Sequence, residues 1–247
     1  MGERQAAAVD DVPRGPGEAD AGGWAADLAP LTGWTSKADA VASVLRKRVT
    51  EGRLRPDERL SEEEVCRILR ISRNTLREAF RMLTHERLLE HRPGQGVFVR
   101  RLTVEDVADL FRLRRLLEPA AVREVRERPA GLDRLAAAVA EAESPAAKGD
   151  WRALGTANMH FHQALVALAG SPRADELMGR VLAELRLVFH VMPDMEDFHE
   201  AYRARNRHIL GLLERGEGQA AADYLTGYLD DAERELVAEY RKVADGR

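Results

Sequence analysis

Residues 61–83 read SEEEVCRILRISRNTLREAFRML, and this stretch predicts two short helices joined by a tight turn. Ser61 can cap the first helix, and Glu64 three positions later completes a capping box. Arg70-Ile71 forms the turn, and Ser72 can cap the second helix. Apolar residues recur at helical spacing in both segments, so each helix has one face to bury. The stretch therefore predicts a helix-turn-helix.

The flanking sequence extends this pattern on both sides. An amphipathic helix is predicted from Ala38 to the stop at Gly52. Two strand-like pieces follow the helix-turn-helix, at 88–91 and 96–100, and Arg92-Pro93-Gly94-Gln95 lies between them as a hairpin tip. Three helices followed by a hairpin are typical of a winged helix-turn-helix, predicted here over residues 36–101.

The second helix of the pair carries side chains that can read DNA. Arg and Asn can bond base edges bidentately in a major groove, and Ser72 with the free N–H groups of the first turn can hold a phosphate. The alternative is that the helix residues form a solvated face with ordinary salt bridges, and that Gln95 belongs to a turn without a role in binding. The candidate DNA-binding residues are Ser72, Arg73, Asn74, Thr75, Arg77 and Arg81 in the helix, and Arg92, Gln95 and Gly96 in the hairpin.

Charge is distributed unevenly along the chain of 247 residues. The formal charge is +6 over residues 36–101 and −6 over residues 102–247, although the whole chain carries only −4. A basic module beside an acidic one fits double-stranded DNA as partner of the first, unless the charges cluster by chance.

Composition limits the remaining possibilities. Residues 1–35 are rich in Gly, Pro and Ala without apolar periodicity and are predicted to be a disordered tail. The chain has one cysteine, which excludes a disulfide framework. It has neither a run of 18 apolar residues nor a secretory signal pattern, so we expect a cytoplasmic protein without a membrane segment. Residues 102–247 predict an all-α bundle of about six helices, the first reaching from Thr103 to about Arg128.

Five polar positions interrupt the apolar stripes of that bundle. Converging polar groups inside a helical bundle indicate a ligand cavity, and the alternative is a few satisfied hydrogen bonds in the core. Arg114 can act as a fork for a carboxylate, or it can form an internal salt bridge with Glu118 one turn away. The candidate effector-binding residues are Arg114, Asn158, His162, Asn206 and Tyr228.

Three blocks carry a resemblance to a known family. They are residues 52–62 (GRLRPDERLSE), residues 71–80 (ISRNTLREAF) and residues 94–99 (GQGVFV). Their order and spacing resemble the GntR family of bacterial transcription regulators. The helical half is similar to the FCD effector domain of the FadR-type subfamily, through residues 113–118, 158–162 and 206–229. The resemblance implies a mainly α chain in two parts, a winged helix-turn-helix and an FCD-like domain for effector binding and dimerisation.

The chain also departs from the family pattern. The family usually has Gly in the turn where this chain has Arg70, and a basic residue where it has Glu63. FCD domains typically hold a metal with an Asp and a His one turn apart and two later His. The matching positions here are Asn158, His162, Asn206 and Tyr228, so only His162 is retained. We therefore expect no bound metal and no cofactor, unless His190, His199 or His208 substitutes as a ligand.

The leading interpretation is a regulator without enzyme activity, which binds a two-half-site operator as a homodimer and responds to a small organic acid. One alternative is a helical metalloprotein that uses the His-containing helices, which would need at least three convergent ligands. Another is a protein that coats DNA without sequence preference. The sequence leaves open the identity of the effector, the operator, and whether binding represses or activates transcription.

Overall fold

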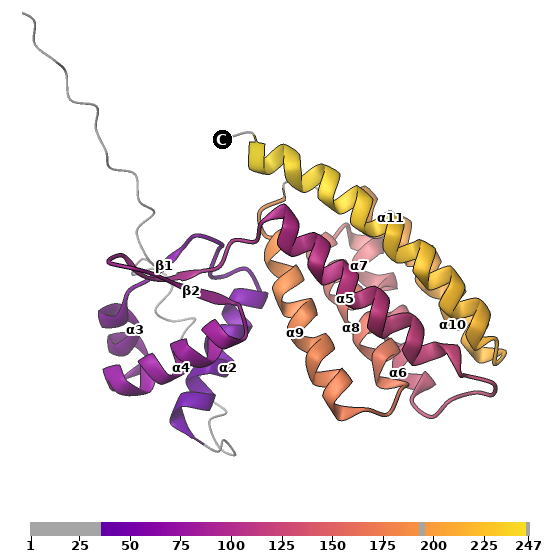
Figure 1. Ribbon diagram of the computed structural model, residues 1–247, viewed down its shortest axis with the longest axis horizontal. Helices are drawn as coiled ribbons and strands as arrows, with labels where there is room; N and C mark the ends of the chain where they lie inside the picture. Colours follow the sequence, from indigo (N-terminus) through magenta and orange to yellow (C-terminus); the bar gives the residue numbers. More distant parts are fainter. Residues whose placement is uncertain (1–35, 193–195, 246–247) are drawn as a thin grey trace, which may run out of the picture. The chain divides into compact units, whose positions relative to one another are not determined.

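The structure, a computed structural model, describes residues 36–192 and 196–245 (Figure 1). The predicted tail at 1–35 lies outside the described residues. The chain divides after Arg100 into two compact units, and each is described by itself.

The first unit is a winged helix-turn-helix, as the sequence predicts. Ser61, Ser72 and Ser36 each begin a helix as N-cap, and the Ser61 and Ser72 hydroxyls accept from the backbone N–H three residues later. These bonds satisfy N–H groups that a helix leaves free at its start. The elements in chain order are α2 (Lys37–Thr50), β1 (Arg59–Leu60), α3 (Glu62–Leu69), α4 (Arg73–His85), β2 (Leu89–Arg92) and β3 (Gly96–Val99).

A three-stranded antiparallel sheet closes this unit, in the order β1-β3-β2. Leu89 pairs with Val99 and Arg92 with Gly96, so β2 and β3 form the predicted hairpin. The first strand was missed by the sequence analysis. It has only two residues, which are too few to show an alternating pattern, and it pairs with β3 through Arg59 opposite Phe98.

The core of the first unit lies between α2 and α4 and under the sheet. α4 buries Leu76, Ala79, Phe80 and Leu83, which is the face predicted from their spacing. On α2, Leu45 and Val49 are fully buried against it. Packing of these faces fixes α4 and leaves its opposite side exposed.

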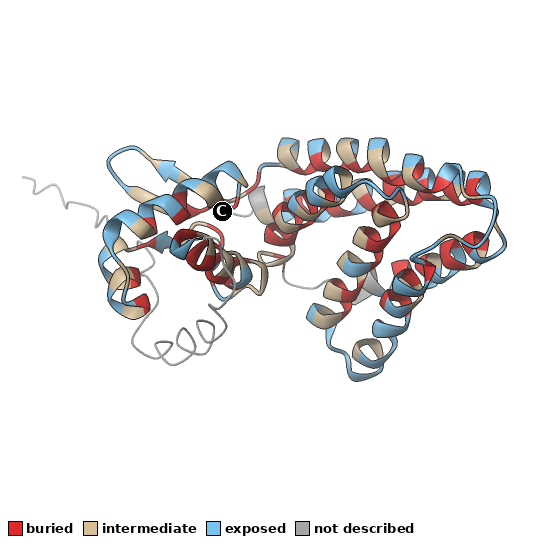
Figure 2. Cartoon of the chain, turned by 90° about the horizontal axis from the view of Figure 1, so that it is seen from below, coloured by how far each residue is buried: buried red, intermediate tan, exposed pale blue. Residues whose placement is uncertain are grey.

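The second unit is an all-α bundle, and α11 lies along α5 (Figure 1). Buried residues follow the inward faces of its helices (Figure 2). Of the helices that the structure describes, none is both long and apolar enough to cross a membrane. The elements are α5 (Val104–Arg123), α6 (Leu132–Glu141), α7 (Glu143–Lys148), α8 (Trp151–Ala167), α9 (Pro172–Phe189), α10 (Glu196–Glu214) and α11 (Gly218–Asp245).

Two predictions about this bundle need correction. The first long helix ends at Arg123 rather than near Arg128. The chain beyond it turns to meet the start of α11, where the Gly218 N–H donates to the Val125 carbonyl over 3.1 Å. Pro129 also disfavours the helical conformation for the residue before it. The short helix α7 was missed, because it has no buried residue in its range and hence no apolar stripe.

Candidate nucleic-acid interface and effector site

The exposed side of α4 presents the predicted recognition residues. Ser72 is extended (φ −74°, ψ 152°), and its hydroxyl accepts from the Thr75 N–H over 3.1 Å. The Ser72 and Thr75 hydroxyls also lie 2.8 Å apart. Because the buried face of α4 is turned inward, its basic and amide side chains lie in solvent; these are Arg73, Asn74, Arg77 and Arg81.

Arg77 has a partner that the sequence analysis did not foresee. Its Nε lies 3.1 Å from both carboxylate oxygens of Glu62, and its Nη2 lies 3.0 Å from Glu62 Oε2. Glu62 belongs to α3, so this pair crosses the helix-turn-helix. The Arg77 side chain stays 60% exposed. The pair therefore orients Arg77 while leaving it accessible to a ligand.

The turn between α3 and α4 places Arg70 in the left-handed region, at φ 52° and ψ 47°. This conformation costs an L-residue on the order of 1 kcal/mol and explains why glycine is favoured at such a turn. The Arg70 N–H donates to the Cys66 carbonyl and closes α3. Arg70 itself is exposed, two residues before Ser72, the first residue that the sequence predicts to contact DNA.

Within the hairpin, Arg92 is held against its own sheet. Its Nη2 lies 2.6 Å from Asp57 Oδ1, its Nε lies 2.6 Å from Glu90 Oε1, and its guanidinium covers the Phe98 ring at 4.3 Å. Gln95 at the tip is exposed, and Gly96 adopts φ 112°, a conformation open mainly to glycine. Arg92 thus stiffens the hairpin, and the tip offers Gln95 and backbone groups.

In the second unit, the predicted polar residues form one continuous chain of contacts. His162 Nε2 lies 3.1 Å from the Tyr228 hydroxyl, which lies 3.3 Å from Asn158 Oδ1. The Asn206 amide donates to the same Asn158 oxygen over 2.7 Å. These four residues come from α8, α10 and α11, so the structure brings together side chains that are up to 70 residues apart.

Glu118 connects this chain to Arg114. Its Oε2 lies 2.7 Å from His162 Nδ1, and its Oε1 lies 2.6 Å from Arg114 Nε. Glu118 is fully buried, and Arg114 is 3% exposed. From the sequence alone, Glu118 is predicted only as a rival partner of Arg114. Its place one turn after Arg114 is the signal that could have identified it as part of the site.

Electrostatics within this chain follow from its burial. Burial alone would raise the pKa of Glu118, but attraction to Arg114 and hydrogen bonds from Arg114 and His162 keep that pKa below its ordinary value. Burial lowers the pKa of His162, against the attraction of Glu118 and with the repulsion of Arg114. Burial also raises the pKa of Tyr228. The stable state is a charged Arg114–Glu118 pair beside a neutral imidazole.

This geometry changes the role expected of Arg114. The guanidinium already has a carboxylate partner, which is the alternative that the sequence left open. One of its nitrogens, Nη2, is buried without a hydrogen-bond partner among the described residues. Removing Arg114 would leave Glu118 as a poorly compensated buried charge, at a cost of about 3–5 kcal/mol. An Arg114 variant would therefore report on folding as well as on ligand binding.

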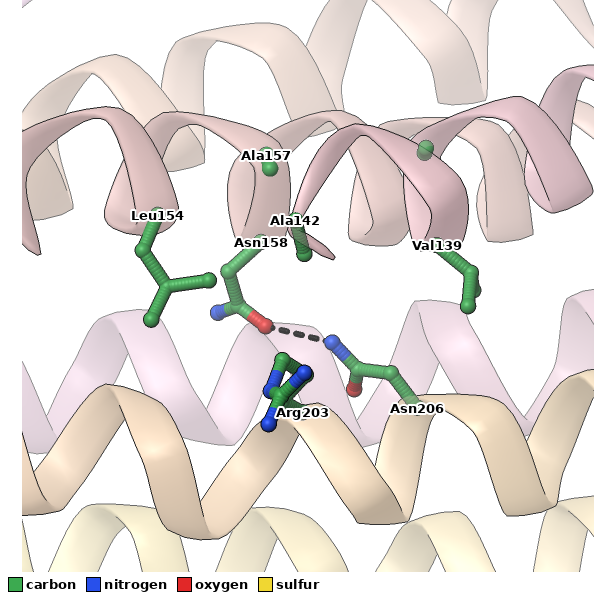
Figure 3. Close-up of a pocket in the computed structure, with 8 residues that line it drawn as sticks. Val139, Ala142, Leu154, Ala157, Asn158, Arg203 and Asn206 are labelled. Atoms are coloured by element: carbon green, nitrogen blue, oxygen red, sulfur yellow. Dashed lines mark hydrogen bonds between the residues drawn. The ribbon is translucent and has the colours of Figure 1, made fainter. Parts of the chain in front are cut away.

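A small cavity lies beside the amide end of the chain (Figure 3). Its volume is about 10 Å³, which is room for about one water molecule. Asn206 Oδ1 is buried and has no hydrogen-bond partner in the described part of the chain. The lining residues are Ala138, Val139, Ala142, Leu154, Ala157, Asn158, Arg203 and Asn206.

The donor set does not fit the metal that the FCD resemblance implies. Both ring nitrogens of His162 are engaged, by Glu118 and Tyr228. Asn158 and Asn206 offer neutral amides, which are poor ligands for a transition metal. Among the described residues, no group of three His, Cys, Asp or Glu side chains could hold a metal ion. The absence of a metal remains a prediction, which elemental analysis of protein purified without chelator can check.

Together, these features define a class: a DNA-binding protein with a winged helix-turn-helix and a helical sensor unit. Residues 37–99 match the model of bacterial regulatory proteins of the gntR family, and residues 109–231 match the FCD domain. The chain belongs to the GntR family of transcription regulators, in its FadR-type branch with an FCD domain. It is a regulator rather than an enzyme.

Individual relatives agree with this assignment. A solved protein from Rhodococcus sp. RHA1, named as a GntR transcriptional regulator, is 44% identical with a TM-score of 0.79, over 83% of this chain and 99% of that one. The galactonate operon transcriptional repressor of Escherichia coli is 27% identical over 62% of this chain and 76% of its own length. The Nta operon transcriptional regulator of Aminobacter aminovorans is 44% identical over 28% of this chain, and the match spans only 33% of that relative.

Proposed function

We propose that the chain acts as a homodimer on a two-half-site operator, and that a small organic acid bound in the helical unit changes its affinity for DNA. The observation that carries the DNA-binding half is the exposed face of α4, where Arg73, Asn74 and Arg77 precede Arg81 in one row. Arginine and asparagine supply the forked donors that read guanine and adenine in the major groove.

Residues 36–101 would contact DNA and residues 102–247 would bind the effector and the second copy. The buried polar chain from Arg114 to Asn206 supports the effector half, because two of its atoms, Arg114 Nη2 and Asn206 Oδ1, are buried without a partner among the described residues. Such atoms are costly unless a ligand or water completes them. A regulator with DNA as its target would work in the cytoplasm.

The experiment that tests DNA recognition compares two arginines of α4 with one elsewhere. DNA fragments selected by the purified protein define the operator, and footprinting then compares Arg73→Ala, Arg77→Ala and the control Arg180→Ala. Arg180 is also exposed, on α9, and pairs with Glu176. Each lost base contact should weaken specific binding by roughly 1–3 kcal/mol, about 5- to 150-fold. Unchanged protection by both α4 variants would refute the assignment.

A further inference from the structure

An arginine outside the polar chain borders the small cavity of the helical unit. Arg203 of α10 lines it together with Asn158 and Asn206 (Figure 3). Arg203 precedes Asn206 by three residues, so both side chains leave neighbouring positions on one face of the helix. In Figure 3 the guanidinium and the Asn206 oxygen lie on the same side of the Asn158–Asn206 hydrogen bond.

The Asn206 oxygen is the second feature that points to a ligand. Asn206 is 6% exposed, and its Oδ1 has no hydrogen-bond partner among the described residues. A buried acceptor without a hydrogen bond is unfavourable, because it has lost its contact with water. A ligand hydroxyl placed in the cavity would donate to this oxygen and replace that contact. The neighbouring arginine would at the same time favour a negative charge on the ligand.

Arg203 currently binds carboxylates of its own chain. Its Nη1 lies 2.7 Å from Glu143 Oε2, and its Nε lies 3.1 Å from Glu200 Oε2. Glu143 also contacts Arg207, and its side chain is 46% exposed. Glu143 belongs to α7, and none of the residues 143–148 is buried. An exposed ion pair of this kind contributes little to stability, so a competing anion can displace it.

The cavity must enlarge before a ligand larger than water can enter. Its volume of about 10 Å³ is bounded on one side by Ala138, Val139 and Ala142, at the end of α6 and the junction with α7. Releasing Glu143 from Arg203 would remove an ion pair that connects this junction to α10. Glu143 is thus placed both to occupy the arginine and to keep the junction closed.

We propose that Arg203 and Asn206 bind the carboxylate and a nearby hydroxyl of a small hydroxy acid, and that Glu143 occupies Arg203 until this ligand displaces it. This inference rests on the proposed function, since it specifies the chemistry of the organic acid that the helical unit senses. Arg203 supplies the charge, because its pairs with Glu143 and Glu200 are partly exposed, whereas the pair of Arg114 with Glu118 is buried. The hydroxyl requirement comes from the unsatisfied Asn206 oxygen.

The test uses two matched sets of probes with the full-length protein. One set is galactonate, galactitol and hexanoate, and the other is lactate, propylene glycol and propionate. Each set separates the carboxylate from the hydroxyl groups. Thermal shift and titration calorimetry should show the hydroxy acid of at least one set binding about tenfold or more tightly than its two counterparts.

Three variants then assign the roles. Arg203→Gln should weaken binding of the hydroxy acid by at least about tenfold, as expected for loss of a charged hydrogen bond. Glu143→Gln should tighten it about two- to fivefold, because the internal competitor is lost. Arg207→Gln is the control: Arg207 also pairs with Glu143 but does not line the cavity. The affinity of Arg207→Gln for the hydroxy acid should stay within about threefold of the wild-type value.

Several results would overturn the inference. Equal binding of the neutral polyol, full binding by Arg203→Gln, or no binding of either hydroxy acid by the wild type and Glu143→Gln would each do so. Operator binding by the same preparations, measured without probes, reports separately on the proposed regulator function and on folding of the variants. A protein that retains its operator but ignores hydroxy acids would refute only this inference.

Discussion

Three buried residues of the helical unit form a network that contains both permanently charged groups and a titratable imidazole. One carboxylate oxygen of Glu118 accepts a hydrogen bond from Arg114, and the other is hydrogen-bonded to His162. All three residues are buried. Such a network is favourable only while each member keeps its partner. The Tyr228 hydroxyl has a single proton to share between His162 Nε2 and Asn158 Oδ1. The chain of contacts therefore depends on the protonation state of His162.

We expect the stability of the protein to decrease as the pH falls below about 6.5, the ordinary pKa of histidine. The pKa of buried His162 is lowered, so below pH 6.5 the unfolded chain binds a proton that the folded chain does not, and stability falls with pH. One such group contributes at most about 1.4 kcal/mol per pH unit. Urea unfolding between pH 7.5 and 5.5 measures the slope.

The variant His162→Gln should flatten this slope. Phe161→Leu is the control, because it disturbs the neighbouring fully buried side chain and leaves the imidazole in place. It should lower stability at every pH and keep the wild-type slope. If His162→Gln unfolds with the same pH dependence as Phe161→Leu, the buried histidine does not control it.

The sequence predicted which polar residues meet in the core, but of their pairings it offered only that of Arg114 with Glu118, as an alternative. Arg114, Asn158, His162, Asn206 and Tyr228 each interrupt an apolar stripe, and stripes can be read from local spacing. The pairing of Glu118 with His162 spans 44 residues, and that of Arg92 with Asp57 spans 35. Partners at such separations depend on tertiary packing, which spacing does not encode. The same holds for Arg77 and Glu62, which meet only because α3 and α4 cross.

At the scale of elements, local signals fixed most helix starts. Thr103 and Asp106 form a full capping box at the start of α5, with bonds of 3.1 and 2.9 Å. The ends of helices and the short elements could not be read from local sequence, because they depend on contacts with residues far away in the sequence. The early end of α5 is an example. The turn before α4 is an element whose local sequence works against its conformation, because Arg70 takes a left-handed φ of 52°.

Arg70→Gly should raise the free energy of unfolding by up to about 1 kcal/mol, since glycine adopts positive φ without the steric cost. If Arg70 contacts a phosphate, the same change should reduce the salt dependence of operator binding by about one unit of slope. Arg87, at φ 59° after α4, is the control. Arg87→Gly should bring a similar gain in stability and leave the salt slope unchanged. A loss of stability in Arg70→Gly would contradict the strain argument.

Helix α11 contains two glycines whose substitution should act in opposite directions. A Cβ at Gly218 would lie 2.4 Å from the Val122 carbonyl oxygen and 2.5 Å from that of Val125. Gly218→Ala should therefore separate α11 from α5 and destabilise the protein by roughly 1–3 kcal/mol. Gly227 has open space around it, so Gly227→Ala should stabilise by roughly 0.8–1.0 kcal/mol. Thermal unfolding of both variants measures these effects, and equal changes in stability would refute the prediction.

For the whole molecule, the two units divide the work of a regulator. In the function proposed above, recognition by α4 belongs to one unit, and sensing by the polar chain belongs to the other. An effector can change DNA affinity only if it binds differently to two arrangements of the protein. In the proposed dimer, a change at the helical unit would alter the spacing of the two α4 helices, which a two-half-site operator would detect.

We expect the dimer to form through the helical unit, on the face of α5 that carries Leu116. This side chain is 69% exposed, the most exposed large apolar side chain among the described residues, and Leu113 and Ala120 lie within about one turn of it. In a two-fold interface each contact occurs twice, so Leu116→Glu removes two buried leucines at about 1.5–3 kcal/mol each. The dimer dissociation constant should rise at least about a hundredfold.

Light scattering at micromolar concentration should find two chains for the wild type and one for Leu116→Glu, whose footprint should weaken at both half-sites. Thr226→Glu, on the exposed side of α11, is the control and should remain dimeric. A wild type that is monomeric both in solution and on DNA would rule out the two-half-site arrangement, whereas a dimeric Leu116→Glu would place the interface elsewhere on the chain.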